Sequence, residues 1–104
     1  MLSDVKRIVE EGHLGVQTYE QFAQACLQRA AAGDKETVSL YVFAKLVQPF
    51  IDYYYHEALN EARAVGFRND LLASLTAYEA ADSLEARQAV LGDAIRKSFE
   101  ITGG

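Results

Sequence analysis

Residues 38–55 read VSLYVFAKLVQPFIDYYY, and this stretch decides the fold class. The segment before the proline is apolar at nearly every position, namely Val38, Leu40, Tyr41, Val42, Phe43, Leu46 and Val47. A helix that is apolar almost all round lies at the centre of a fold or is shared with another chain. Because Pro49 lacks a backbone N–H, we expect it to kink or break this helix near Val47.

A β-strand is the alternative structure for residues 38–43, because β-branched and aromatic side chains are common in strands. The flanking residues 34–36 and 44–46 are typical of helices, however. No other part of the chain looks like a partner strand. The sequence therefore favours a helix over the whole stretch that precedes the proline.

Two helices are expected upstream, over residues 3–11 and 16–32, separated by a turn at Gly12 and Gly15. The second has apolar residues at alternating spacings of three and four, namely Val16, Tyr19, Ala23, Cys26 and Ala30. This spacing places one broad face of the helix on a core. Gly33 is expected to end it in the left-handed conformation that glycine tolerates.

After the proline, apolar residues recur at spacings of four and three, namely Ile51, Tyr55, Ala58, Ala62 and Val65. The spacing predicts a helix of about four turns that ends at Gly66. In this register Tyr55 points into the core and Tyr53 points away from it.

Two further helices are predicted, the first capped by Asn69 or Asp70 and the last by the capping box of residues 82–85. The residues expected to face inward are Leu71, Leu72, Leu75 and Tyr78 in the first, and Leu84, Leu91, Ile95 and Phe99 in the last. The last helix is expected to end at Ile101. Because the connections are short, neighbouring helices should pack antiparallel. We therefore predict an all-α fold, a single domain over residues 1–104 in which five to six short helices form a compact bundle.

Composition narrows the range of functions. Half of the residues are hydrophobic and 24% are charged, which is typical of a globular protein. The formal net charge of −5, with no cluster of Lys and Arg, argues against a nucleic-acid or membrane partner. The first residues lack the pattern of a signal peptide, and no stretch approaches the ~20 apolar residues that span a bilayer. We expect a cytoplasmic protein.

The run Tyr53–Tyr54–Tyr55 is the most unusual local feature. Three consecutive helical positions span ~200° of the circumference, so these rings cannot all face one core. Tyrosines outside a core are enriched at protein interfaces, because a rigid apolar ring carries a polar tip. We therefore predict that the chain self-associates, as a homodimer, through the apolar and tyrosine-rich face around residues 38–55. The candidate interface or ligand-binding residues are Phe50, Tyr53, Tyr54 and His56.

The alternative is a signalling or ligand-binding bundle that uses His56 for phosphotransfer or metal binding. His56 is followed ten residues later by Gly66, and in this respect the segment resembles histidine phosphotransfer domains, which are acidic helical bundles of similar size. The resemblance implies a phosphorylated His56. Leu59 and Asn60 stand where that family has a lysine and a glycine, so the groups that would hold the phosphoryl charge and admit a partner are missing.

No catalytic motif accompanies these features. The chain has no glycine-rich phosphate loop, serine elbow, HExxH sequence or Cys–His zinc pairing. We therefore predict no enzymatic activity, no cofactor and no metal, and a function as a protein–protein interaction or regulatory module.

Overall fold

The computed structural model describes residues 2–99, and every regular element among them is a helix. The elements are α1 (Ser3–Glu11), α2 (Val16–Ala31), α3 (Thr37–Leu46), α4 (Gln48–His56), α5 (Glu61–Ala80) and α6 (Leu84–Ser98). The predicted all-α bundle is thereby confirmed.

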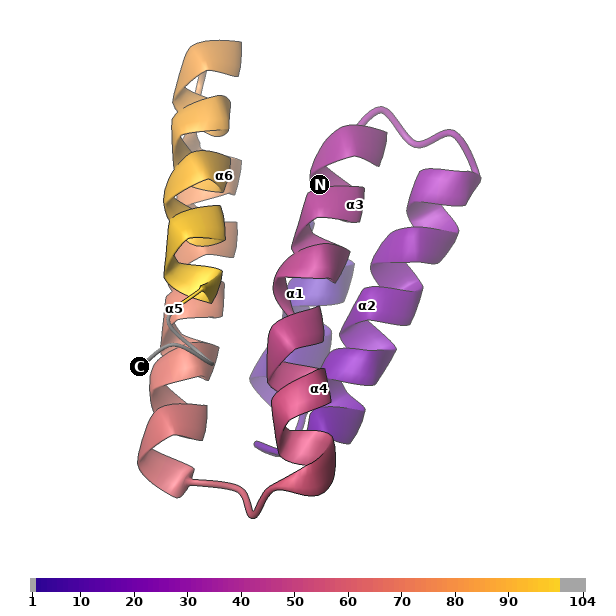
Figure 1. Ribbon diagram of the computed structural model, residues 1–104. Helices are drawn as coiled ribbons and strands as arrows, with labels where there is room; N and C mark the ends of the chain where they lie inside the picture. Colours follow the sequence, from indigo (N-terminus) through magenta and orange to yellow (C-terminus); the bar gives the residue numbers. More distant parts are fainter. Residues whose placement is uncertain (1, 100–104) are drawn as a thin grey trace.

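The expected helix breaks around the apolar stretch are confirmed. Gly33 adopts a φ of 81°, the left-handed conformation that ends α2 and turns the chain back into α3. Residues 37–46 are helical and not a strand. Pro49 lies in the first turn of α4, where its missing N–H costs no hydrogen bond, and α4 continues in nearly the direction of α3 (Figure 1).

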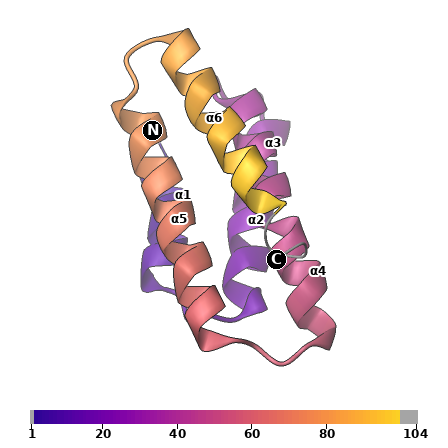
Figure 2. The ribbon, with the colours of Figure 1, turned by 60° about the vertical axis from the view of Figure 1, so that its left-hand side comes forward.

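The helices form two layers that share one core. The first layer, which we call the N-terminal layer, consists of α1 to α4, with α2 packed against α1, α3 and α4. The second is the hairpin of α5 and α6, in which α5 packs on α1 and α6 packs on α3 (Figures 1 and 2). The largest fully buried side chains come mostly from the first layer and include Tyr19, Phe22, Phe43, Phe50 and Leu75.

A polar cluster joins the hairpin to the start of α3. The hydroxyl of Tyr78 on α5 donates to a carboxylate oxygen of Glu36 and is also hydrogen-bonded to the hydroxyl of Ser39. The guanidinium of Arg87 on α6 lies over the Tyr78 ring, 5.8 Å from its centroid. Burial and the Glu36 carboxylate raise the pKa of Tyr78. Hydrogen bonds as well as apolar contacts therefore hold the C-terminal end of α5 against the start of α3.

The structure corrects the predicted helix boundaries after the proline. α4 ends at His56, and α5 begins at Glu61 and runs through Gly66 without a break. The helix expected to end at Gly66 is therefore wrong, as are the caps expected at Asn69 or Asp70. The true cap is Asn60, whose side-chain oxygen accepts a hydrogen bond from the backbone N–H of Arg63.

This break changes the register of the tyrosines. Tyr54 is 8% exposed whereas Tyr55 is 63% exposed, the reverse of the predicted orientation for Tyr55. The prediction failed because Ala58 to Val65 do not belong to the same helix as Ile51. The apolar stripe from Ile51 to Val65 combined residues of α4 and α5, and it therefore assigned Tyr55 in α4 to the wrong side of its helix.

The apolar stripe predicted to face inward from the last helix is also mostly outside the core. Leu84, Ile95 and Phe99 are 71%, 39% and 72% exposed, and Ala94 is the one fully buried residue of α6. Ser83 caps this helix by accepting from the N–H of Ala86, one residue later than the predicted capping box begins. The predicted end at Ile101 lies outside the described residues. None of the helices in the described range 2–99 is long and apolar enough to cross a membrane.

Candidate functional site

Phe50 and Tyr54, predicted as interface residues, lie between the two layers and not on the outer surface. Phe50 is 1% exposed and stacks on Phe67 of α5, with ring centroids 4.6 Å apart and planes inclined by 20°. Tyr54 packs on Phe50 at 4.7 Å, and Tyr19 of α2 meets Phe67 edge-on at 5.0 Å. These rings hold α5 against α4, so Phe50 and Tyr54 are core residues of the single chain.

The other two predicted residues have different surroundings. Tyr53 is half-buried, with its ring edge-on to that of Tyr54 at 4.8 Å. His56 is exposed at the end of α4, and its ring lies 5.9 Å from that of Tyr55. Within residues 2–99 no group of three or more His, Cys, Asp or Glu side chains is placed to hold a metal ion. The structure therefore brings Phe50, Tyr53 and Tyr54 together and leaves His56 apart.

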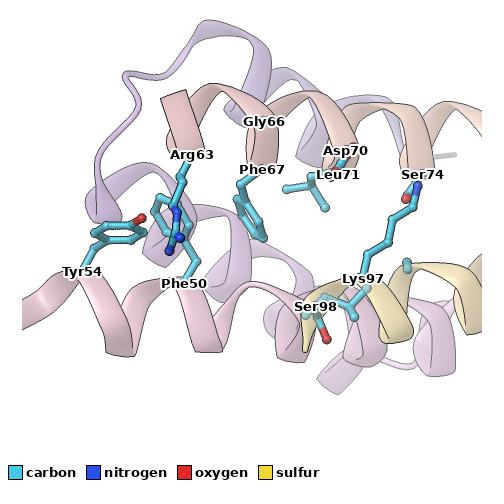
Figure 3. Close-up of a pocket in the computed structure, with 12 residues that line it drawn as sticks. Phe50, Tyr54, Arg63, Gly66, Phe67, Asp70, Leu71, Ser74, Lys97 and Ser98 are labelled. Carbon is cyan, nitrogen blue, oxygen red and sulfur yellow. The ribbon is translucent and has the colours of Figure 1, made fainter. Parts of the chain in front are cut away.

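A cavity of about 470 Å³ opens beside Phe50 and Tyr54, between α4 and the α5–α6 hairpin (Figure 3). We call it the seam cavity. Its lining residues are Leu46, Phe50, Tyr54, Arg63, Gly66, Phe67, Asp70, Leu71, Ser74, Ala94, Lys97 and Ser98. The apolar members form the floor, and the polar members stand around the mouth. The volume falls within the range of about 300–1,000 Å³ that is typical of small-molecule sites.

The charges at the mouth of the seam cavity are not equivalent. Figure 3 shows Lys97 reaching from α6 toward Ser74, which lies one helical turn after Asp70. Arg63 instead extends from α5 toward Phe50 at the opposite end of the cavity (Figure 3). Among residues 2–99 the ion pairs join other side chains, so neither Arg63 nor Lys97 is neutralised by a described acid. The mouth therefore carries one cation at each end, Arg63 beside the aromatic rings and Lys97 beside Ser74.

Gly66 lies in the wall of the seam cavity, inside α5. A β-carbon built on Gly66 would meet no atom within 4 Å, so neither close packing nor backbone conformation requires glycine here. A glycine inside a helix costs about 1 kcal/mol relative to alanine. The visible effect of this residue is to leave the cavity wall open.

A second surface feature lies on the outer side of α2 and α3. Val38, Tyr41 and Leu27 are 74%, 52% and 38% exposed and lie close together. They border a groove of about 620 Å³ whose lining residues are Leu27, Ala30, Ala31, Thr37, Val38, Tyr41 and Val42. We call this surface the α2–α3 patch. None of its residues is charged.

The exposed side of α2 beside this patch is also poor in charge. Its four glutamines, all exposed, follow one helical stripe at Gln17, Gln21, Gln24 and Gln28. The charged residues of α2 are Glu20 and Arg29. The Arg29 guanidinium is already engaged, with its nitrogens 2.7 Å from the Asp4 carboxylate and 2.9 Å from that of Asp34. Exposed Glu20 lines the adjoining groove together with Leu27, so the uncharged surface ends at this residue.

Cys26 carries no reactive chemistry at neutral pH. Its side chain is fully buried in α2, and burial raises the pKa of its thiol to about 12. A nucleophilic cysteine needs an accessible thiolate, so this thiol behaves as a small core residue.

The sequence indicated Phe50 and Tyr54 as candidate site residues and Leu46 and Leu71 as apolar core residues, but it did not indicate the polar residues of the seam cavity or Phe67. Arg63, Gly66, Phe67 and Asp70 were assigned to a helix end and a loop, and their common stripe appears only when α5 is one helix. The glutamine stripe of α2 was also missed, although its spacings of four, three and four can be read from the sequence.

No family model matches the chain, and no curated protein or solved structure gives a significant match either.

Proposed function

We propose that the protein is a non-enzymatic interaction or regulatory module of the cytoplasm that forms a homodimer through the α2–α3 patch. The observation that carries the proposal is the exposure of Val38 and Tyr41 beside an uncharged groove. Only the N-terminal part of the predicted face around residues 38–55 is therefore proposed as the interface. Val38 and Tyr41 in this part are exposed, whereas Phe50 and Tyr54 are buried in the core of the monomer.

The composition of the patch supports a protein partner. Interface cores are depleted in charged residues and enriched in aromatic ones, and a tyrosine buried at the centre often carries much of the binding energy. Tyr41 lines the groove and is 52% exposed, with the ammonium of Lys45 lying 5.3 Å from its ring centroid. The uncharged glutamine stripe next to it supplies amide donors and acceptors for a polar rim.

Charge favours a second copy as the partner. The chain carries a net charge of −5, so two copies repel each other over most of their surface. The lining of the α2–α3 patch contains no acidic residue, so two copies can meet there without bringing lining carboxylates together. A two-fold dimer uses the same patch on both chains.

Sedimentation equilibrium at micromolar concentration tests the proposal with two matched tyrosine variants. The wild-type chain should have twice the monomer mass of 11.5 kDa. Tyr41→Ala should raise the dissociation constant at least ~10-fold, because a central interface aromatic contributes about 2 kcal/mol or more. Tyr55→Ala removes a tyrosine of similar exposure outside the patch and should leave the dissociation constant unchanged. A wild-type chain that stays monomeric, or equal effects of both variants, would contradict the proposal.

A further inference from the structure

The seam cavity is built from two kinds of surface that suit one kind of small molecule. Its floor contains the rings of Phe50, Tyr54 and Phe67, and its mouth carries the guanidinium of Arg63. We propose that the seam cavity binds a small aromatic carboxylic acid, with its ring on this floor and its carboxylate on Arg63. This inference does not depend on the α2–α3 patch, which belongs to other helices.

The floor favours a flat ring. Phe50 and Phe67 are already stacked with centroids 4.6 Å apart, and Tyr54 leans on Phe50 at 4.7 Å. Aromatic groups that meet at such distances attract each other beyond the effect of buried area alone. Leu46 and Leu71 close the floor with aliphatic surface. An apolar ring placed here replaces water on carbon atoms.

The mouth selects an acid over a neutral or basic ligand. A guanidinium binds a carboxylate through two parallel hydrogen bonds, a geometry that a single ammonium does not provide. Arg63 has no described acidic partner within ion-pair distance. Its side chain extends toward the aromatic floor and away from the end of the cavity where Lys97 and Asp70 stand (Figure 3). The carboxylate is therefore assigned to Arg63.

Gly66 supplies an independent reason to treat the seam cavity as a binding site. It occupies the one helical turn of α5 between Arg63 and Phe67, where any side chain would project into open space. Glycine weakens the helix at this position, and no contact in the described chain compensates for that cost. A site that must admit a ring beside Arg63 accounts for the missing side chain.

The first test compares three probes that share a naphthalene ring, by calorimetric titration of the full-length chain. They are 2-naphthoate, the neutral alcohol 2-naphthalenemethanol, and the cationic 2-naphthylmethylamine. The acid should bind saturably and at least ~10-fold more tightly than the alcohol, and the amine most weakly. Absence of saturable binding of 2-naphthoate, or equal affinities for the acid and the alcohol, would overturn the proposal.

Three variants then locate the site. Arg63→Gln should weaken 2-naphthoate at least ~10-fold without affecting the alcohol. The matched control Arg7→Gln removes an exposed arginine of α1 outside the cavity and should change either affinity by less than ~3-fold. Gly66→Leu should abolish binding of both probes by filling the wall, and its thermal midpoint should not fall because leucine is a better helix former than glycine. Wild-type affinity in Arg63→Gln or in Gly66→Leu would place the ligand elsewhere and overturn the proposal.

Amide chemical shifts separate this site from the α2–α3 patch. Titration with 2-naphthoate should move the amide signals of Gly66, Phe67 and Leu71 and leave those of Val38 and Tyr41 in place. The reverse pattern would show that the acid binds the outer groove, which contradicts the proposal.

Discussion

Helices α2 and α6 have nearly the same length, 16 and 15 residues, and both carry apolar residues at helical spacing. Five residues of α2 are fully buried, whereas in α6 only Ala94 is. The difference lies in their neighbours, because α2 packs on α1, α3 and α4 while α6 packs on α5 and α3 alone. Periodicity thus shows that a helix has an apolar face, and the number of surrounding helices decides how much of that face is buried.

The same contrast applies to the two layers. Among the described residues, 20 hydrophobic side chains are buried. Fifteen of them lie between Leu2 and Tyr54, in or next to the N-terminal layer, and five lie in the α5–α6 hairpin. Regions with few buried apolar contacts open at lower free energy than the rest of a protein. We therefore expect the hairpin to open before the N-terminal layer does.

Thiol labelling should show the largest difference. Because Cys26 is buried and its pKa is raised to about 12, almost no thiolate is available at pH 8 in the folded chain. Its reaction with a disulfide reagent should be at least ~1,000-fold slower than in the unfolded chain. In the double variant Cys26→Ala, Ala94→Cys, the thiol in α6 should react at least ~10-fold faster than Cys26. Equal rates would mean that both layers open in one step.

Two phenylalanine truncations measure the same contrast at equilibrium. Phe22→Ala removes a fully buried ring from α2 and should lower the free energy of unfolding by about 4 kcal/mol. Phe99 follows α6 and is 72% exposed, so Phe99→Ala should change the free energy of unfolding by less than about 0.5 kcal/mol. Denaturant titration measures both values. A loss of several kcal/mol in Phe99→Ala would show that the outer side of α6 is covered in solution.

The tyrosine register allows a finer comparison within one helix. Tyr54→Ala should cost about 3 kcal/mol of stability through the cavity it leaves beside Phe50. Tyr55→Ala should stay within about 0.5 kcal/mol, because its ring is mostly in water. Chemical denaturation of the two variants compares them directly. If Tyr55→Ala is the more damaging, the helix break after His56 has been placed wrongly.

The smallest expected effect is a gain. Gly66→Ala adds a methyl group where no atom lies within 4 Å, so it should stabilise α5 by about 1 kcal/mol without a clash. A raised thermal midpoint, with α5 amides better protected from hydrogen exchange, would confirm this. Destabilisation would indicate that the chain bends at Gly66 in solution.

The sequence predicted the first half of the fold better than the second for a physical reason. Around Gly33 and Pro49 the backbone constraints are strong, because a positive φ suits glycine and proline cannot donate a hydrogen bond. Between His56 and Glu61 no residue prevents a helix, and the break depends on the cap that Asn60 provides. The sequence predicted a helix end at Gly66, but α5 continues through this residue. The packing of α5 on α1 and α6 outweighs the low helix propensity of one glycine.

The candidate site was predictable only in part. The run of aromatic residues from Phe50 to Tyr54 marked the correct region, but which ring faces the core depends on where α4 ends. The seam cavity requires α5 to pass beside α4, a tertiary arrangement that no local pattern encodes. The exposure of Val38 and Tyr41 depends likewise on the absence of a further helix over α3 in the described chain.

The unequal division of the core also has a consequence during synthesis on the ribosome. The residues up to Tyr54 contain most of the buried hydrophobic side chains, so the N-terminal layer can collapse once it has left the ribosome and before the hairpin emerges. Translation of residues 57–99 then takes roughly 2–9 s at ordinary elongation rates. Throughout that interval Leu46, Phe50 and Tyr54 have no hairpin to cover them. A nascent chain stalled after Tyr54 has left the ribosome and before the hairpin has emerged should therefore be the form that chaperones bind most strongly.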